Sequence, residues 1–345
     1  MMNRTFSSAI SEKNCFDFLR FIFAFSVFCS HFCVSTGNNL IKWPISASMG
    51  VSGFFVISGF LIMKSYYRSS GLVDYGLKRI KRIFPAYMLT VVLCAFLFSF
   101  VSSLSFSDYF SSTTFYKYLF ANLSFLNFIQ PTLPGVFESN HLPYVNASLW
   151  TIKVELSLYA VVPLLVLFVK KKPIKLFVSV YILSFVFSWI MTYFSNKFDN
   201  SLLLLLRRQF LGQIIYFISG VILLFYFDQI KTQTKWLVPV SILVVVLKYY
   251  FSFLLLDLFY PFCFTVLIIW FAYYFKKLSI FSKYGDCSYG FYLFHFPVIQ
   301  LFIHFGWLKQ NPVLLFVVCF CVILSLSYLS WHLLEKKFLK RRFSK

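Results

Sequence analysis

Long apolar segments separated by short polar connections dominate the chain from end to end. Ten of these segments approach the roughly 20 residues that a helix needs to cross a bilayer. They cover residues 15–36, 47–66, 84–105, 148–169, 174–194, 209–227, 236–251, 253–275, 286–305 and 312–333. The pattern predicts an all-α integral membrane protein of about ten transmembrane helices, in which the boundary between the seventh and eighth is the least marked.

Composition excludes several other classes of protein. Hydrophobic residues make up 60% of the 345 residues and charged residues 12%, against about 45–50% and 25% in soluble domains. A globule in water has too little interior to bury that much apolar surface, and disordered, collagen-like and disulfide-scaffold proteins are excluded as well. The longest stretch outside the spans is 106–147, which we expect to form an outer loop over the mouth of the bundle. We expect no appended soluble domain and interpret residues 1–345 as a single membrane domain.

The net charge of +21 can indicate a nucleic-acid partner, but its distribution indicates membrane topology instead. With the N-terminus inside, 23 of the 32 Lys and Arg residues fall on inner connections and 7 on outer ones. Arg20 and Lys153 fall within spans. This asymmetry follows the positive-inside rule and predicts that both termini are cytoplasmic, with the lipid bilayer as partner and no nucleic acid.

The cysteines do not indicate a metal site. Eight are present, in or beside the spans, and none forms a C-x-x-C pair. Cys29, His31 and Cys33 are spaced by two residues, so on a helix neighbouring members point about 200° apart and cannot converge on one ion. We therefore predict no bound metal.

The first span carries three ionisable residues, and each is costly in a bilayer unless it is paired or hydrated. Asp17 and Arg20 are three residues apart and can pair on one helical face. Arg20 and His31 are eleven apart, which places them on the same face about 16 Å apart along the axis. This geometry suits a substrate that enters from the cytoplasm and reacts deeper in the membrane. Alternatively, Arg20 extends to lipid headgroups and His31 bonds a neighbouring helix.

The second span and the segment after it carry two further signals. Gly50, Gly53 and Gly59, with nearby serines that include Ser58, permit close helix approach or a locally broken helix, although packing alone also explains them. Arg79 and Arg82 lie on one helical face and can bind phosphate by bidentate hydrogen bonds. An ordinary basic stop signal at the inner surface is the alternative.

The later spans carry candidate acid–base residues. Glu155 and Tyr159 are one turn apart, and Glu155 lies about 10 Å deep, a depth comparable to that of His31. A His31–Glu155 pair would relieve the desolvation of both and resembles a general-base arrangement. Pro297 frees a backbone carbonyl in mid-helix beside His295. Glu335, at the end of the last span, is interpreted as part of a solvated end cap.

Taken together, these segments resemble the acyltransferase-3 family of integral membrane acyltransferases. The blocks run in the family's order: Arg20 with His31, Phe-Phe-x-x-Ser-Gly-Phe at 54–60, Arg79-x-x-Arg82 with Pro85, Trp150 to Glu155 with Tyr159, Tyr292 to Pro297, and Glu335. Phe21, where relatives commonly have Gly, and Lys153 depart from the pattern.

The resemblance implies transfer of an acyl group, usually acetyl from acetyl-CoA, to a hydroxyl of a surface glycan or its lipid-linked precursor at the bacterial inner membrane. Arg20, Arg79 and Arg82 would bind CoA phosphates, and Ser58 would face the thioester. His31 would act as base or carry the acyl group transiently, balanced by Glu155. The supporting residues would be Asp17, Trp150, Tyr159, Tyr292 and His295.

A transporter of a sugar, a lipid-linked glycan or a small anion is the alternative of a different class. About ten helices, buried His and Glu residues and glycine-rich spans are compatible with one. The line from Arg20 to His31, the paired arginines and the absence of a recognisable repeat favour the acyltransferase.

Overall fold

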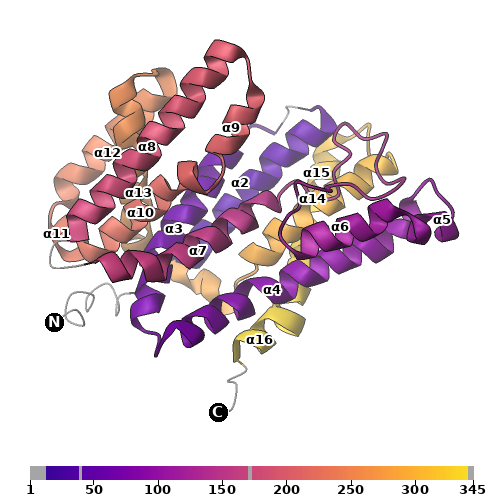
Figure 1. The fold of residues 1–345 in the computed structure, drawn as a ribbon, viewed down its shortest axis with the longest axis horizontal. Coiled ribbons are helices and arrows are strands. Elements are labelled where there is room, and N and C mark those ends of the chain that lie inside the picture. Colours follow the sequence, from indigo (N-terminus) through magenta and orange to yellow (C-terminus); the bar gives the residue numbers. More distant parts are fainter. Residues whose placement is uncertain (1–12, 39–40, 170–172, 341–345) are drawn as a thin grey trace. The chain divides into compact units, whose positions relative to one another are not determined.

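The computed structural model describes residues 13–38, 41–169 and 173–340, and within these ranges it contains helices and no strand (Figure 1). The α-helices are α2 (Phe16–Thr36), α3 (Ala47–Tyr67), α4 (Leu72–Leu97), α5 (Phe106–Ser111), α6 (Thr113–Leu123), α7 (Trp150–Phe168), α8 (Pro173–Phe198), α9 (Ser201–Arg207), α10 (Phe210–Phe225), α11 (Phe227–Thr232), α12 (Thr234–Tyr250), α13 (Leu254–Tyr274), α14 (Ser288–His304), α15 (Pro312–Ser330) and α16 (Lys336–Lys340). Two 3-10 segments, η2 (Phe98–Val101) and η3 (Lys276–Tyr284), and one π-helical turn, η4 (Trp331–Glu335), complete them.

Each of the ten predicted segments coincides with a helix, but not all boundaries are correct. The third segment was expected to begin at residue 84, whereas α4 begins at Leu72 and contains Pro85 in its interior. The turns before Pro85 are basic and amphipathic, and they extend the helix on the N-terminal side of its apolar segment. The stretch 106–147 is not only a loop, because Ser105 and Ser112 cap the short helices α5 and α6.

Within the described ranges, eight segments are long and apolar enough to cross a membrane. They are 16–36, 47–67, 72–101, 150–168, 173–198, 201–225, 254–274 and 312–339. Helices α12 and α14 have 17 residues each, at the short end of the range for a spanning helix. The chain is therefore a multi-pass membrane protein.

The chain divides into two compact units, each assembled from separate stretches of sequence. Unit 1 comprises 1–20, 52–75 and 154–283, and unit 2 comprises 21–51, 76–153 and 284–345. We describe each unit by itself, and the interpretation of 1–345 as a single domain stays a prediction. Of the basic residues used to predict topology, those at 4, 170–172 and 341–345 lie outside the described residues.

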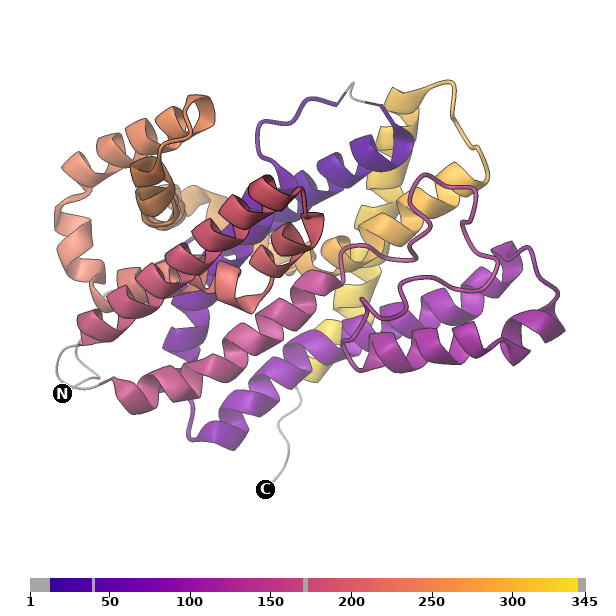
Figure 2. The ribbon, with the colours of Figure 1, turned by 45° about the horizontal axis from the view of Figure 1, so that its top comes forward.

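In unit 1, α8 packs against α10 and α12 packs against α13 (Figure 2). Helices α3 and α10 approach each other closely at two glycines. A Cβ atom on Gly59 would lie 1.9 Å from the Phe217 carbonyl oxygen, and one on Gly220 would lie 2.2 Å from the Val56 carbonyl oxygen. The small residues of the second span therefore serve close helix approach, as their pattern predicts.

We expect Gly59→Ala to destabilise the protein by about 2–3 kcal/mol, because the added methyl group meets backbone on the facing helix, which cannot rotate away. The midpoint of thermal unfolding in detergent measures this. Gly76→Ala on α4 is the matched control, since its Cβ would have nothing within 4 Å. Equal midpoints for the two variants would contradict a tight α3–α10 crossing.

Candidate active site

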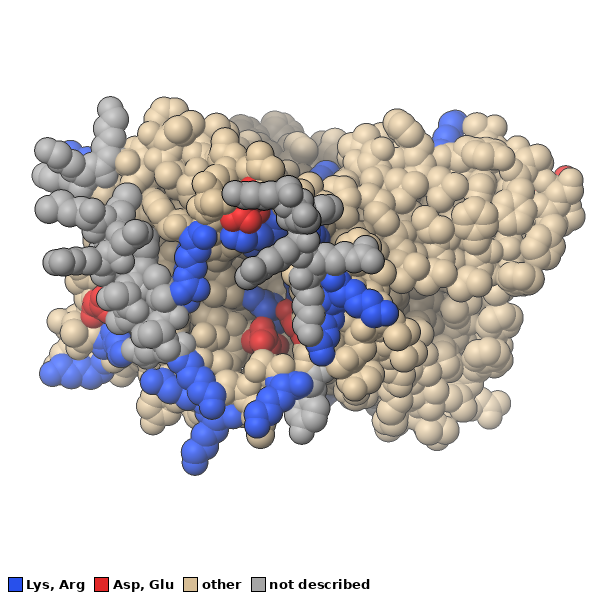
Figure 3. All heavy atoms as spheres, turned by 90° about the horizontal axis from the view of Figure 1, so that it is seen from below, with Lys and Arg blue, Asp and Glu red and all other residues tan. Residues whose placement is uncertain are grey.

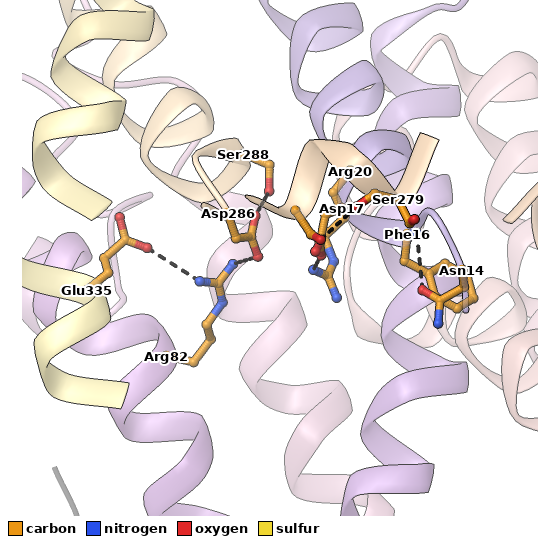
Figure 4. Close-up of polar contacts among 10 residues, drawn as sticks. Asn14, Phe16, Asp17, Arg20, Arg82, Ser279, Asp286, Ser288 and Glu335 are labelled. Atoms are coloured by element: carbon orange, nitrogen blue, oxygen red, sulfur yellow. Dashed lines mark hydrogen bonds and ion pairs between the residues drawn. The ribbon is translucent and has the colours of Figure 1, made fainter. Parts of the chain in front are cut away.

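Helix α2 presents the first candidate residues. Arg20 Nη1 donates to Asp17 Oδ1 at 2.8 Å, the pair that their three-residue spacing predicts (Figure 4). Both side chains are partly exposed, at 23% and 34%. Eleven residues further along the same helix, His31 lies half-buried. The predicted alignment of one cation with one imidazole on a single helical face follows from the unbroken helix.

In unit 2, His31 is paired with another histidine. His31 Nδ1 lies 2.8 Å from His295 Nε2 on α14, and His295 Nδ1 lies 2.7 Å from the Tyr292 carbonyl oxygen. The two imidazole rings are nearly parallel, with an angle of 15° between their planes. The His295 side chain is completely buried, and the Phe296 ring packs perpendicular to the His31 ring, with centroids 5.3 Å apart.

The directions of these two hydrogen bonds follow from the Tyr292 carbonyl oxygen, which is the last acceptor in the series. The Tyr292 carbonyl can only accept, so His295 Nδ1 carries the hydrogen and donates it. In a neutral imidazole the other nitrogen then holds a lone pair, so His295 Nε2 accepts from His31 Nδ1. His31 is thereby fixed as the tautomer whose Nε2 carries the lone pair, the form required of a base or a nucleophile.

A break in the hydrogen bonding of α14 helps to hold this arrangement. Pro297 has no N–H to offer the Leu293 carbonyl one turn earlier, and Asn146 Nδ2 donates to that carbonyl at 2.8 Å. The freed carbonyl predicted from Pro297 is thus satisfied by the segment that precedes α7. From α7 itself, Thr151 Oγ1 lies 2.8 Å from the Tyr292 hydroxyl.

Glu155 belongs to unit 1 and has a different neighbour. The Tyr159 hydroxyl donates to Glu155 Oε1, one turn along α7, and the Tyr159 carbonyl accepts from the Tyr75 hydroxyl at 2.8 Å. The expected pairing of Glu155 with His31 stays a prediction. Trp150 at the start of α7 and Ser58 on α3 are both half-buried.

The second arginine of the paired motif is bound to two carboxylates in unit 2. Arg82 Nη2 lies 2.5 Å from Asp286 Oδ2, and Arg82 Nη1 lies 3.4 Å from Glu335 Oε2 (Figure 4). The guanidinium carbon also lies over the rings of Tyr289 and Trp331, at 5.5 and 5.8 Å from their centroids. These contacts come from the segment before α14, from α14 itself and from η4. Arg82 therefore links α4 to the beginning of α14 and to the turn that follows α15.

Glu335 is not the solvated end cap that its position suggested. Its residue is only 1% exposed, and Ser330 Oγ donates to its Oε1 at 3.0 Å. The π-helical turn Trp331–Glu335 adds a residue to the last turn and directs this carboxylate inward. Asp286 was not among the predicted residues. The sequence feature that could have indicated it is its position as a single acid at the start of an apolar span, where a buried carboxylate requires a cation as partner.

Comparisons with known proteins identify the family of the chain. The chain belongs to the acyltransferase-3 family, described as an acyltransferase domain, which it matches over residues 13–332. That range includes His31, Arg82, Glu155 and His295, and runs through both units. The protein is therefore a membrane acyltransferase, and the transporter alternative is not supported.

Two relatives show how far the similarity extends. An O-acetyl transferase of Shigella phage Sf6 is 28% identical over 347 residues, covering 96% of this chain and 97% of that protein. Nodulation protein 10 of Rhizobium leguminosarum bv. viciae is 31% identical over 165 residues, covering 45% of this chain and 44% of that protein. No solved structure matches the chain.

We expect Arg82→Gln to lower the midpoint of thermal unfolding strongly, because removing one partner of a buried ion pair costs about 3–5 kcal/mol. The triple variant Arg82→Gln, Asp286→Asn, Glu335→Gln should recover much of the loss, since no unpaired charge remains. Lys117→Gln, an exposed cation on α6, is the control. The ion-pair assignment would be contradicted if the unfolding midpoint of Arg82→Gln were no lower than that of the control and the triple variant showed no recovery.

Proposed function

We propose that this acyltransferase moves an acetyl group from acetyl-CoA to a hydroxyl of a cell-surface glycan or its lipid-linked precursor. The name of the phage relative, an O-acetyl transferase similar over nearly the whole chain, supports oxygen as the acceptor atom and acetyl as the group. The observation that carries the proposal is the His31–His295–Tyr292 hydrogen-bond chain, because it places a lone pair on His31 Nε2.

Two routes use that lone pair. In the direct route, His31 Nε2 removes the proton of the acceptor hydroxyl while its oxygen attacks the thioester carbonyl; the C–S bond then breaks and the CoA sulfur takes the proton back. In the covalent route, Nε2 attacks the thioester and CoA leaves as the thiolate; the hydroxyl oxygen then attacks the acetyl-imidazolium, the C–N bond breaks, and the hydroxyl proton passes to the CoA sulfur. In the direct route His31 becomes a cation, and the His295 lone pair stabilises it through the Nδ1–H.

The neighbours of each arginine indicate which of them we assign to binding acetyl-CoA. Arg82 already contacts two carboxylates, so we assign it to anchoring α4. Arg79, one turn away on that helix, and Arg20, oriented by Asp17, are assigned to the phosphates of CoA. Ser58 is proposed to bond the thioester carbonyl, and Glu155 to balance the imidazolium, with Trp150 and Tyr159 supporting the acceptor side.

We also propose that the protein lies in the bacterial inner membrane, with ten spanning helices and both termini in the cytoplasm. Lys and Arg side chains gather on the face seen in Figure 3, which supports a basic inner surface. A fluorescent protein fused to the C-terminus should therefore fluoresce, and alkaline phosphatase fused there should be inactive. Alkaline phosphatase inserted near residue 129 should be active, and the reverse pattern would overturn this orientation.

We expect His31→Ala to abolish acetylation in cells. A strain lacking the gene, complemented with wild type or with His31→Ala at matched membrane levels, is assayed for acetyl content of extracted surface glycans. His141→Ala, which removes an exposed histidine of the same unit, should behave as wild type. Acetylation restored equally by His31→Ala would remove His31 from the chemistry.

His295 is proposed as a positioning residue that acts through His31. His295→Leu should lower kcat about a hundredfold or more with little change in the KM for acetyl-CoA, because His31 loses the acceptor that fixes its tautomer. His295→Gln should recover part of the rate, since an amide oxygen can accept from His31 Nδ1. Radiolabelled acetyl transfer in membranes measures both, and a Gln variant no better than Leu would argue against this role.

A further inference from the structure

Unit 1 contains a pocket whose lining includes none of the residues proposed for the transfer reaction. It lies where the ends of α10, α11 and α13 meet the beginning of α12, and its empty volume of about 680 Å³ includes solvent at its open side. Its walls are mainly apolar, and the buried ones include Leu223, Phe227, Val266 and Ile269. A hollow of this kind at the end of a helix bundle suits a hydrocarbon chain.

The open side of the pocket is basic. Lys231 and Lys276 both line the pocket, and both residues are exposed. Lys231 Nζ lies 6.0 Å from the centre of the Phe227 ring, at the boundary between charge and apolar wall. Lys235 and Lys277 follow closely in sequence and outweigh the single acid of α11, Asp228.

Aromatic rings also line the pocket. The rings of Trp270 and Tyr274 stack with their centroids 5.0 Å apart, and the buried Tyr273 ring packs on Phe227 at 4.8 Å. Trp and Tyr side chains are typical of the interface between hydrocarbon and headgroups. The lining thus combines buried apolar side chains, aromatic rings and two exposed lysines, groups that suit the acyl chain and the phosphate of a phospholipid.

We propose that this pocket binds an anionic phospholipid, with its phosphate between Lys231 and Lys276 and an acyl chain against Phe227 and Ile269. Basic pockets between transmembrane helices recognise anionic headgroups by this combination of charge and apolar burial. The occupant is a resident lipid of the bilayer, separate from the acyl donor and acceptor.

Native mass spectrometry of the purified full-length protein tests this without any activity assay. In a neutral detergent, the protein is offered equal amounts of phosphatidylglycerol and phosphatidylcholine with the same acyl chains. Wild type should retain one phosphatidylglycerol in preference, and retention should fall as salt is raised from 50 to 500 mM. Equal retention of the two lipids, or no response to salt, would overturn the proposal on wild-type protein alone.

Variants test the contribution of the lysines and that of the apolar hollow separately. Lys231→Gln with Lys276→Gln should weaken phosphatidylglycerol binding about thirtyfold, since each basic residue contributes about a factor of five. Lys197→Gln is the matched control, because that lysine also lies over aromatic rings in unit 1 but not at the pocket. Thr234→Phe, which fills the hollow and keeps both lysines, should reduce binding of the lipid as well.

Two outcomes would assign the pocket differently. Unchanged binding in the double lysine variant, or in Thr234→Phe, would mean that lipid adheres to the outer surface rather than to the pocket. Displacement of phosphatidylglycerol by free CoA at micromolar concentration, lost in the double lysine variant, would make the pocket a donor site. Either result overturns the proposal, and neither depends on the role of His31.

Discussion

Pairing of polar groups that water cannot reach is the constraint on which this structure depends. In a bilayer an unpartnered ion or backbone group costs several kcal/mol, so each buried one must find a partner within the protein. Unit 2 meets this demand at two places. His31 bonds His295, which bonds a backbone carbonyl, and Arg82 bonds the carboxylates of Asp286 and Glu335.

The two clusters use helix α14 at different points along its length. The Arg82 cluster contacts the segment that leads into α14, and the histidine pair lies further along the helix, near Pro297. Between them, Asn146 and Thr151 bond the helix from the side. A helix of 17 residues is thereby fixed along its length by polar contacts, where lipid-facing helices rely on packing. Rigid placement of this kind keeps a reacting imidazole in one orientation.

Much of this architecture was predictable, because it depends on spacing along one helix. The Asp17–Arg20 pair, the carbonyl freed by Pro297 and the close approach at Gly59 are all consequences of helical geometry at fixed offsets. The contact of His31 with His295 was not predictable, since the two residues lie 264 positions apart and their approach depends on packing. Glu335 was misassigned because a π-helical turn, which no spacing rule anticipates, changes the direction of its side chain.

The last acceptor in the histidine chain is the backbone of residue 292 rather than a side chain. Triads that end in a carboxylate lose their tautomer control when that one acid mutates. Here every amino acid at position 292 would present the same carbonyl, provided that α14 stays helical. Tautomer control is thus protected from sequence drift at 292, where a substitution changes the phenol and its contacts with Thr151 and the Ser148 carbonyl.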